Sequence, residues 1–182
     1  MLVSEDKDAI EKARFWSTQA RDQAPWYQHS ELGYNYRMSN VLAGIGRGQL
    51  LHLDEHRQKK KEIYMRYKEA FKDLPLTMNP YQDVAEPNFW LSCILIDKDI
   101  VDSGKVNPEI IRLELEKYNI ESRPIWKPMH LQPYYEARDY ITYDGQNNSE
   151  DIFNRGLCLP SDIKMTEEEQ AVVIEIIRGL FK

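Results

Sequence analysis

Cysteine is scarce in this sequence, with only Cys93 and Cys158 among 182 residues. Two cysteines make no disulfide framework, and both lie in apolar runs (LSCILI and GLCLP), so we expect buried, reduced thiols. A run of 18 apolar residues is also missing, which argues against a membrane-spanning helix. The first residues, MLVSEDKDAIEK, are acidic where a signal peptide is basic. We therefore expect a cytoplasmic protein without a membrane partner.

The sequence also lacks an excess of basic residues. The net charge is −6 and the isoelectric point is near 5.3, which argues against general binding of nucleic acid because that requires a basic surface. A local basic spot could still bind phosphate. The chain contains 42% hydrophobic and 30% charged residues, proportions typical of a globular protein. Its length suits one domain, or one domain with part of another.

The first 72 residues predict a short strand, a helix, a loop and a long helix. MLVSE reads as a strand, and Ser4 is the expected N-cap of a helix over residues 6–19. Residues 21–38 lack periodicity and are expected to form a loop. Ser39 should cap a helix over residues 40–72, with apolar positions at helical spacing. Gly44, Gly46 and Gly48 each cost this helix about 1 kcal/mol relative to alanine, so we interpret them as a tight packing face.

After Pro75 the pattern alternates between strands and helices. Strands are expected over residues 88–96, 121–125 and 157–159. A helix should start at Asn107-Pro108 and continue to about residue 118, and a short one should cover residues 149–154. Thr166 and Glu169 form a capping box for the last helix, which should continue to residue 177. These elements indicate an α/β unit in which helices cover one small sheet.

Several motifs resemble catalytic or binding sites without the rest of their context. The glycines of GIGRG lie inside the expected helix, where a nucleotide-binding loop requires a preceding strand. His52 and His56 occur in an H-x-x-E-H pattern, but no third ligand is evident, so a solvated helix face is favoured over a zinc site. The run KKK at residues 59–61 is also interpreted as a solvated face. No nucleophile elbow is present, and no lysine stands in a setting that suggests a desolvated amine.

Four stretches, in this order, are specific enough to indicate a family: MLVSED, GYNYRMSNVLAGIGRGQL, ESRPIWKPMHLQP, and GLCLPS before the TEEE-capped last helix. They resemble the sugar aminotransferases of the DegT/StrS type. That resemblance implies the aspartate-aminotransferase fold (fold type I of pyridoxal-phosphate enzymes), with pyridoxal 5'-phosphate as cofactor. It also implies a homodimer with shared active sites, a nucleotide-linked keto-sugar substrate and an amino-acid donor, for which we expect glutamate.

The loop GYNYR carries the first expected site residues. In the family this loop reaches into the active site of the partner subunit. The resemblance implies that the side-chain amide of Asn35 donates a hydrogen bond to the cofactor phosphate. It also implies that Arg37 and Tyr34 bind substrate, with the Arg37 guanidinium on the diphosphate. The alternatives are that Asn35 is only a turn residue after Gly33 and that Arg37 forms a surface ion pair.

The segment ESRPIWKPMHLQP carries the remaining expected substrate-binding residues. Its prolines stiffen the chain. Trp126 is suited to cover a sugar or uracil ring, Lys127 and His130 to meet phosphate or hydroxyl groups, and Arg123 belongs to the same predicted substrate side. The alternative places Trp126 in an interface core and leaves Lys127 and His130 as ordinary surface groups.

The resemblance also predicts how the chain is organised. Residues 1–38 should be a remnant of the large cofactor-binding domain, residues 39–72 a long connecting helix, and residues 73–182 the small α/β domain. The lysine that binds the cofactor covalently lies upstream in this family and has no counterpart here. We therefore expect no catalytic residue in this C-terminal half and no activity from it alone. The alternative function is a non-catalytic module that dimerises or binds sugar nucleotides.

Overall fold

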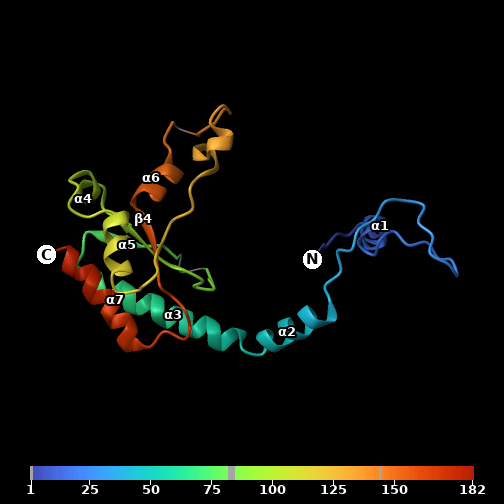
Figure 1. Ribbon diagram of the computed structural model, residues 1–182, viewed down its shortest axis with the longest axis horizontal. Helices are drawn as coiled ribbons and strands as arrows, with labels where there is room; N and C mark the ends of the chain where they lie inside the picture. Colours follow the sequence, from blue (N-terminus) through green and yellow to red (C-terminus); the bar gives the residue numbers. More distant parts are fainter. Residues whose placement is uncertain (1, 82–84, 144) are drawn as a thin grey trace. The chain divides into compact units, whose positions relative to one another are not determined.

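The computed structural model describes residues 2–81, 85–143 and 145–182. Its backbone forms two compact units, residues 1–52 and residues 53–182 (Figure 1). The first unit contains α1 (Lys7–Ser17) and α2 (Asn40–Leu50). The second unit contains, in chain order, α3 (Leu53–Ala70), β1 (Leu76–Met78), β2 (Ser92–Ile96), α4 (Lys98–Asp102), α5 (Pro108–Glu116), β3 (Arg123–Pro124), η1 (Met129–Leu131), η2 (Pro133–Tyr135), α6 (Asn148–Arg155), β4 (Gly156–Leu159) and α7 (Glu167–Leu180). The expected three-part division at residues 38 and 72 stays a prediction about the complete enzyme.

The start of the chain differs from the sequence-based expectation in two ways. Asp6, not Ser4, caps α1, because its carboxylate accepts the backbone N–H of Ala9. The Ser4 hydroxyl instead accepts the N–H of Asp6, two residues ahead. Residues 2–5 of the predicted first strand form no strand, and Met1 lies outside the described residues. A strand needs a neighbour for its backbone groups, and no other described segment pairs with this one.

The predicted helix over residues 40–72 is interrupted. α2 begins after its Ser39 cap as expected, but it ends at Leu50, and α3 begins at Leu53. At the break the N–H of His52 donates to the carbonyl of Gln49 in a tightened turn. A Cβ atom built on Gly44, Gly46 or Gly48 would meet no atom within 4 Å beyond its chain neighbours and the backbone of its own helix. The expected tight packing of these glycines is therefore not made within the described chain and stays a prediction.

The second unit is built on an antiparallel sheet with the strand order β1-β2-β4-β3. Alternate residues of β2 and β4 point into the core, where α3, α5 and α7 supply the opposing apolar side chains. Tyr67 of α3 and Phe71, directly after its end, are the largest fully buried residues, and their rings stack with centroids 5.7 Å apart. This arrangement confirms the prediction of one small sheet covered by helices.

Local capping signals in the second unit are confirmed. The Asn107 side chain caps α5 by accepting the N–H of Ile110, and Pro108 occupies the first turn. Thr166 and Glu169 form the reciprocal capping box of α7. Among the described residues, no helix has the length and apolar character needed to cross a membrane.

The predicted strand over residues 88–96 starts four residues late, at Ser92. Phe89 has a φ of 52°, a left-handed conformation that a bulky side chain rarely adopts. Its ring is buried and meets Tyr64 and Tyr81 at centroid distances of 5.5 and 4.8 Å. The packing of this ring offsets the strained backbone, which cannot continue the β ladder. The predicted strand at residues 121–125 is likewise reduced to Arg123–Pro124.

Candidate functional site

The predicted site residues fall into two groups, one in each compact unit. In the first unit, three backbone hydrogen bonds hold the GYNYR loop against the end of α1. The N–H of Tyr34 donates to the carbonyl of Trp16 at 2.9 Å, the N–H of Gln19 donates to the carbonyl of Tyr34 at 3.0 Å, and the N–H of Tyr36 donates to the carbonyl of Ser17 at 3.0 Å. These backbone hydrogen bonds to the end of α1 therefore fix the conformation of the loop.

Gly33 is required by this close approach. A Cβ atom at residue 33 would lie 2.3 Å from the backbone nitrogen of Ala20, closer than any side-chain atom tolerates. The opposing backbone is itself unusual, because Gln19 and Ala20 have φ values of 69° and 49°. These left-handed residues turn the chain sharply after α1. The glycine at the head of GYNYR thus has a steric cause in this fold.

Asn35 stands exposed on this anchored loop with its amide group oriented. Its Oδ1 accepts the backbone N–H of Arg37 at 3.2 Å. The amide NH2 therefore remains available, and it has no hydrogen-bond partner among the described residues. The resemblance implies that this amide donates to the cofactor phosphate, and that role stays a prediction. The local turn contact considered as its alternative is present, because Oδ1 accepts a backbone N–H two residues ahead.

Arg37 and Tyr36 line a hollow of about 430 Å³ beside α1, together with Arg14. Two guanidinium groups at one hollow favour an anionic ligand such as a diphosphate, which arginine binds through its planar fork. No carboxylate forms an ion pair with Arg37 within the described chain. The Tyr34 ring is exposed and lies 5.6 Å from that of Tyr36.

In the second unit, Trp126 is exposed and lies beside a second exposed indole that sequence analysis did not single out. Its ring centroid is 5.8 Å from that of Trp90, and the planes are tilted by 41°. Trp90 is directed outward by the turn at Phe89, where the Asn88 side chain accepts the N–H of Trp90 at 3.0 Å. The sequence did not reveal this pair of indole rings, because the two tryptophans lie 36 positions apart in the chain.

The environment of Lys60 differs from the sequence-based expectation. It lies in the run expected to form a solvated face, yet its ammonium donates to the backbone carbonyls of Trp90 and Ser161. Partial burial lowers the pKa of Lys60, and the nearby Asp162 carboxylate opposes that shift. The neighbouring Lys59 behaves as expected and pairs with Glu55 at 2.7 Å. The structure therefore corrects the expectation that Lys60 belongs to a solvated face.

Arg123 and Lys127 are exposed on the same segment as Trp126. The Arg123 guanidinium donates to the Glu121 carboxylate at 2.8 Å, a pairing that a competing anion would have to displace. Lys127 has no hydrogen-bond or ion-pair partner in the part of the chain that the structure describes. Of the two cations, Lys127 is the one whose charge is not already matched.

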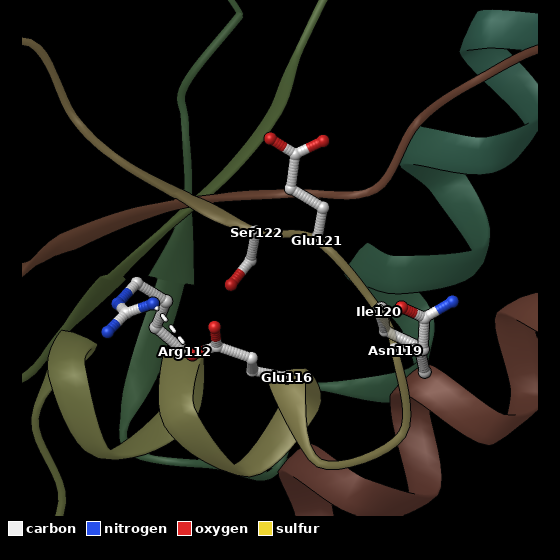
Figure 2. A pocket seen from close by; sticks show the side chains of 6 residues that line it. All are labelled: Arg112, Glu116, Asn119, Ile120, Glu121 and Ser122. Atoms are coloured by element: carbon white, nitrogen blue, oxygen red, sulfur yellow. Dashed lines mark hydrogen bonds and ion pairs between the residues drawn. The ribbon is translucent and has the colours of Figure 1, made fainter.

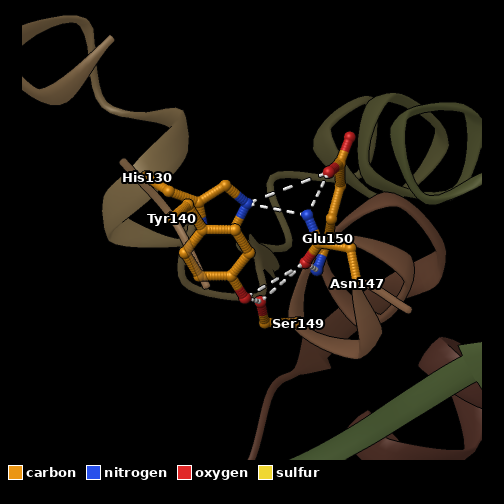
Figure 3. Close-up of polar contacts among 5 residues, drawn as sticks. All are labelled: His130, Tyr140, Asn147, Ser149 and Glu150. Atoms are coloured by element: carbon orange, nitrogen blue, oxygen red, sulfur yellow. Dashed lines mark hydrogen bonds and ion pairs between the residues drawn. The ribbon is translucent and has the colours of Figure 1, made fainter. Parts of the chain in front are cut away.

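His130 belongs to a polar cluster at the start of α6 (Figure 3). Its ring stacks on that of Tyr140, with centroids 3.7 Å apart and planes within 15°. Its Nε2 lies 2.9 Å from the amide nitrogen of Asn147 and 3.8 Å from the Glu150 carboxylate. The side chain is 14% exposed. His130 is therefore largely buried and held by neighbouring polar groups, while its contact with substrate stays a prediction.

The Asn147 amide determines which nitrogen of His130 carries the proton. Asn147 is the N-cap of α6, and its Oδ1 accepts the backbone N–H of Glu150 at 3.2 Å. The other end of the amide must be the NH2 group, which is a donor only. The facing Nε2 must then accept, so neutral His130 carries its proton on Nδ1.

We predict that this tautomer reverses in Asn147→Asp. Aspartate caps a helix as well as asparagine does, but it presents only acceptors to the ring. Nitrogen-15 NMR of neutral His130 should show the Nδ1–H form in the native chain and predominantly the Nε2–H form in the variant. Asn154→Asp, the same change at an exposed position of α6, is the control and should leave the tautomer unaltered. An unchanged pattern in Asn147→Asp would contradict the assignment.

A small pocket of about 210 Å³ lies between α5 and the segment that leads into β3 (Figure 2). Arg112 and Ser122 are among its lining residues. The guanidinium of Arg112 is already engaged by Glu109 and Glu116 at 2.7–3.0 Å, and these carboxylates raise its pKa. With its one cation neutralised, this pocket does not provide an anion site like the hollow beside Arg37.

Within the described residues, no group of three or more His, Cys, Asp or Glu side chains could hold a metal ion. The H-x-x-E-H pattern at His52 and His56 therefore gains no further ligand from the fold. His52 precedes α3 and His56 lies within it. The two histidines do not share one continuous helix, as the zinc interpretation required.

The fold matches a known class of enzyme. A solved DegT/DnrJ/EryC1/StrS aminotransferase from Brucella abortus superposes with a TM-score of 0.78, over 98% of this chain and 45% of that one, at 22% identity. The architecture is therefore that of fold type I pyridoxal-phosphate enzymes, and the share covered fits the expected C-terminal segment.

The sequence comparisons define the family. The pattern of the DegT/DnrJ/EryC1/StrS aminotransferase family matches residues 1–178, and the chain belongs to this family. It is 44% identical to EpsN of Bacillus subtilis strain 168, named as a pyridoxal phosphate-dependent aminotransferase, over 100% of this chain and 46% of EpsN. It is 29% identical to the GDP-perosamine synthase of Vibrio cholerae, over 100% of this chain and 48% of that protein. The chain spans about half the length of these relatives.

Pyridoxal 5'-phosphate is the cofactor of this family. The loop residues of this chain fit one part of that molecule, its phosphate. The Asn35 amide offers a neutral N–H donor with no partner among the described residues, and its orientation is set by the bond to the N–H of Arg37. Such a donor binds a phosphate oxygen without adding charge.

Proposed function

We propose that this chain is the C-terminal part of a pyridoxal-phosphate-dependent aminotransferase that transfers an amino group to a nucleotide-linked keto-sugar, with glutamate as donor. The anchored GYNYR loop, with the exposed and locally oriented Asn35 amide, is the observation that carries the proposal. A 4-keto-6-deoxy sugar is the substrate class we favour, with UDP as the nucleotide. The complete enzyme would be a cytoplasmic homodimer with shared active sites and would supply amino sugars for surface polysaccharide.

In this proposal each group of residues has a separate task. The cofactor, when bound, supplies the chemistry that moves the amino group between donor and sugar. Asn35 binds its phosphate from the neighbouring subunit, and the Arg37 guanidinium binds the diphosphate of the substrate. Trp126 covers a ring of the substrate, with Trp90 beside it, while Lys127 and the Nδ1–H of His130 bind oxygen atoms. Preorganisation by α1 and α6 supports these tasks, because groups already held in place lose little freedom on binding.

The direct test is an assay of the complete polypeptide that contains this chain. With pyridoxal phosphate, glutamate and a UDP-linked 4-keto-6-deoxy sugar, it should form 2-oxoglutarate and an amino sugar in equal amounts. A GDP-linked keto-sugar tests the nucleotide preference in the same assay. Binding of sugar nucleotide without turnover by a polypeptide that retains the upstream lysine would favour the non-catalytic module instead.

Asn35→Ala in the complete enzyme should weaken cofactor binding. The variant loses a donor to a charged acceptor, a hydrogen bond that contributes roughly 1.5–3 kcal/mol, so affinity for pyridoxal phosphate should fall by about 10- to 150-fold. In Asn35→Asp, whose side chain has the same shape, the affinity for pyridoxal phosphate should fall further, because a carboxylate repels the phosphate. Activity lost during turnover should return when cofactor is added. Titration with cofactor measures the affinity of both variants.

Mixed dimers test whether the loop acts across the interface. Asn35→Ala subunits are combined with subunits that lack the upstream lysine, and exchange is verified by mass spectrometry. If the loop serves the partner's site, each mixed dimer regains one intact site and up to half of the native activity per dimer. Verified exchange without recovery would show that Asn35 acts within its own subunit or not at all.

A further inference from the structure

The two cysteines, 65 residues apart in the sequence, are directly opposed in the sheet. Cys93 of β2 pairs with Cys158 of β4, and their sulfur atoms lie 3.5 Å apart as free thiols. A disulfide needs a sulfur–sulfur distance of about 2.05 Å. The two side chains would therefore have to approach by about 1.5 Å, which side-chain rotation supplies more readily than movement of paired strands.

The backbone hydrogen bonds around Cys93 show which kind of antiparallel pair it forms with Cys158. The N–H of Cys93 donates to the side chain of Asn79 at 3.0 Å, and its carbonyl accepts the N–H of Asn79 at 2.9 Å. Both groups thus face the β1 side, away from β4. Cys93 and Cys158 therefore form a non-hydrogen-bonded pair, for which Cα atoms lie about 4.5 Å apart. That spacing is within the range of about 4.4–6.8 Å that disulfides span.

The thiols lie on the sheet face opposite the core. Ile94 and Leu157, their neighbours along the strands, point into the core, and side chains alternate between faces. Cys158 is 7% exposed and Cys93 is half-buried. A small reagent therefore meets this pair from outside the core, without a need to unfold the packed helices.

The environment of the two sulfurs differs. The Cys93 thiol donates a hydrogen bond to the Cys158 sulfur, and this bond lowers the pKa of Cys158 while burial opposes the shift. The guanidinium of Arg123, which is opposite Cys158 on β3, lowers that pKa further. The pKa of Cys93 is raised, first by the same hydrogen bond and then by burial. The position of the Arg123 guanidinium opposite Cys158 therefore favours Cys158 as the thiolate of the pair.

We propose that Cys93 and Cys158 form a site of reversible oxidative modification, in which a peroxide converts the opposed thiols into a cross-strand disulfide. The Cys158 thiolate attacks one peroxide oxygen, the O–O bond breaks, and the departing hydroxide takes a proton to become water. Cys158 is now a sulfenic acid. The Cys93 sulfur then attacks it, the S–O bond breaks and a second water leaves. Two thiols are oxidised to one disulfide, and one peroxide is reduced to two waters.

The bond would join β2 to β4 in the same row of the sheet as Arg123. It would close a long loop of chain and so restrict the unfolded state. The native fold already holds the sulfurs together, so oxidation changes the sheet little. The modification should consequently raise resistance to unfolding, and reduction by a thiol should return the chain to its starting state.

The test treats the folded chain with hydrogen peroxide, blocks remaining thiols and maps peptides by mass spectrometry. We expect one intramolecular link between Cys93 and Cys158, loss of two hydrogens in the intact mass, and reversal by dithiothreitol. The urea midpoint of the oxidised chain should be higher than that of the reduced chain. Two thiols that remain free, or links only between chains, would overturn the proposal.

Matched variants separate the two roles. In Cys93→Ser, Cys158 has no resolving partner, so a sulfenic acid should accumulate and react with dimedone. In Cys158→Ser, the remaining Cys93 should react more slowly with peroxide. Serine is close to cysteine in size, and a urea melt of each reduced variant verifies folding. Equal rates for the two variants, or faster reaction of Cys158→Ser, would contradict the assignment of Cys158 as the attacking sulfur.

Discussion

The 182-residue chain by itself is expected to catalyse no transamination. Enzymes that use pyridoxal phosphate hold it through a lysine amine, and we expect that lysine upstream of this segment. The strongest lysine candidate within the chain is Lys60, because burial lowers its pKa. Its ammonium is nevertheless bound to the carbonyls of Trp90 and Ser161, contacts that favour the charged and non-nucleophilic form.

Borohydride reduction of the chain with pyridoxal phosphate, followed by peptide mapping, checks this expectation. Only scattered, substoichiometric labelling of exposed lysines should result, and 2-oxoglutarate should not form from glutamate. Lys60→Met serves as the matched variant and should leave the labelling pattern otherwise unchanged. One lysine labelled stoichiometrically, or measurable turnover, would refute the prediction and make that lysine the candidate for the catalytic amine.

Tyr67→Ala should destabilise the second unit by about 3–5 kcal/mol, the range for removal of a large buried aromatic side chain. The ring is fully buried against Phe71, and its hydroxyl donates to the carbonyl of Pro160 at 2.9 Å. Burial also raises the pKa of Tyr67, so the neutral donor persists. The alanine variant loses apolar contact, leaves a cavity and frees the Pro160 carbonyl.

Urea unfolding monitored by amide exchange of β2 and β4 measures this effect within the second unit. Tyr67→Phe should cost about 1–3 kcal/mol, because it leaves only the Pro160 carbonyl without its donor. Tyr118→Ala, at an exposed position, should change stability by less than about 0.5 kcal/mol. A loss below about 1.5 kcal/mol in Tyr67→Ala would show that the core collapses around the gap or that the ring is not central to it.

Much of the fold was predictable because the relevant hydrogen bonds are local. Asn107-Pro108 and the Thr166–Glu169 box act within four residues, and both helices start where they were expected. The prediction of the first cap was wrong although this cap is also local. Ser4 and Asp6 are both competent acceptors, and only the path of the backbone selects between them. The family itself followed from specific strings and needed no coordinates.

The candidate site was predictable only in part. The family strings led to Asn35, Trp126 and His130, but not to the residues that hold or accompany them. Trp90 lies 36 residues from Trp126. Asn147 lies 17 residues from His130 and carries only an N-cap signal before S-E-D. Such partners meet through the fold, and a single sequence contains no signal of distant pairing.

By itself the sequence determined the family, the small helix-covered sheet, the capped starts of α2, α5 and α7, and the loop that carries Asn35. The tertiary structure decided the interruption of the long helix at residues 51–52, the late start of β2 and the partial burial of Lys60. It also decided that Cys93 faces Cys158. The difference has one physical reason. Caps and periodicity depend on neighbours within a few residues, whereas register, burial and strained turns depend on which distant segments pack together.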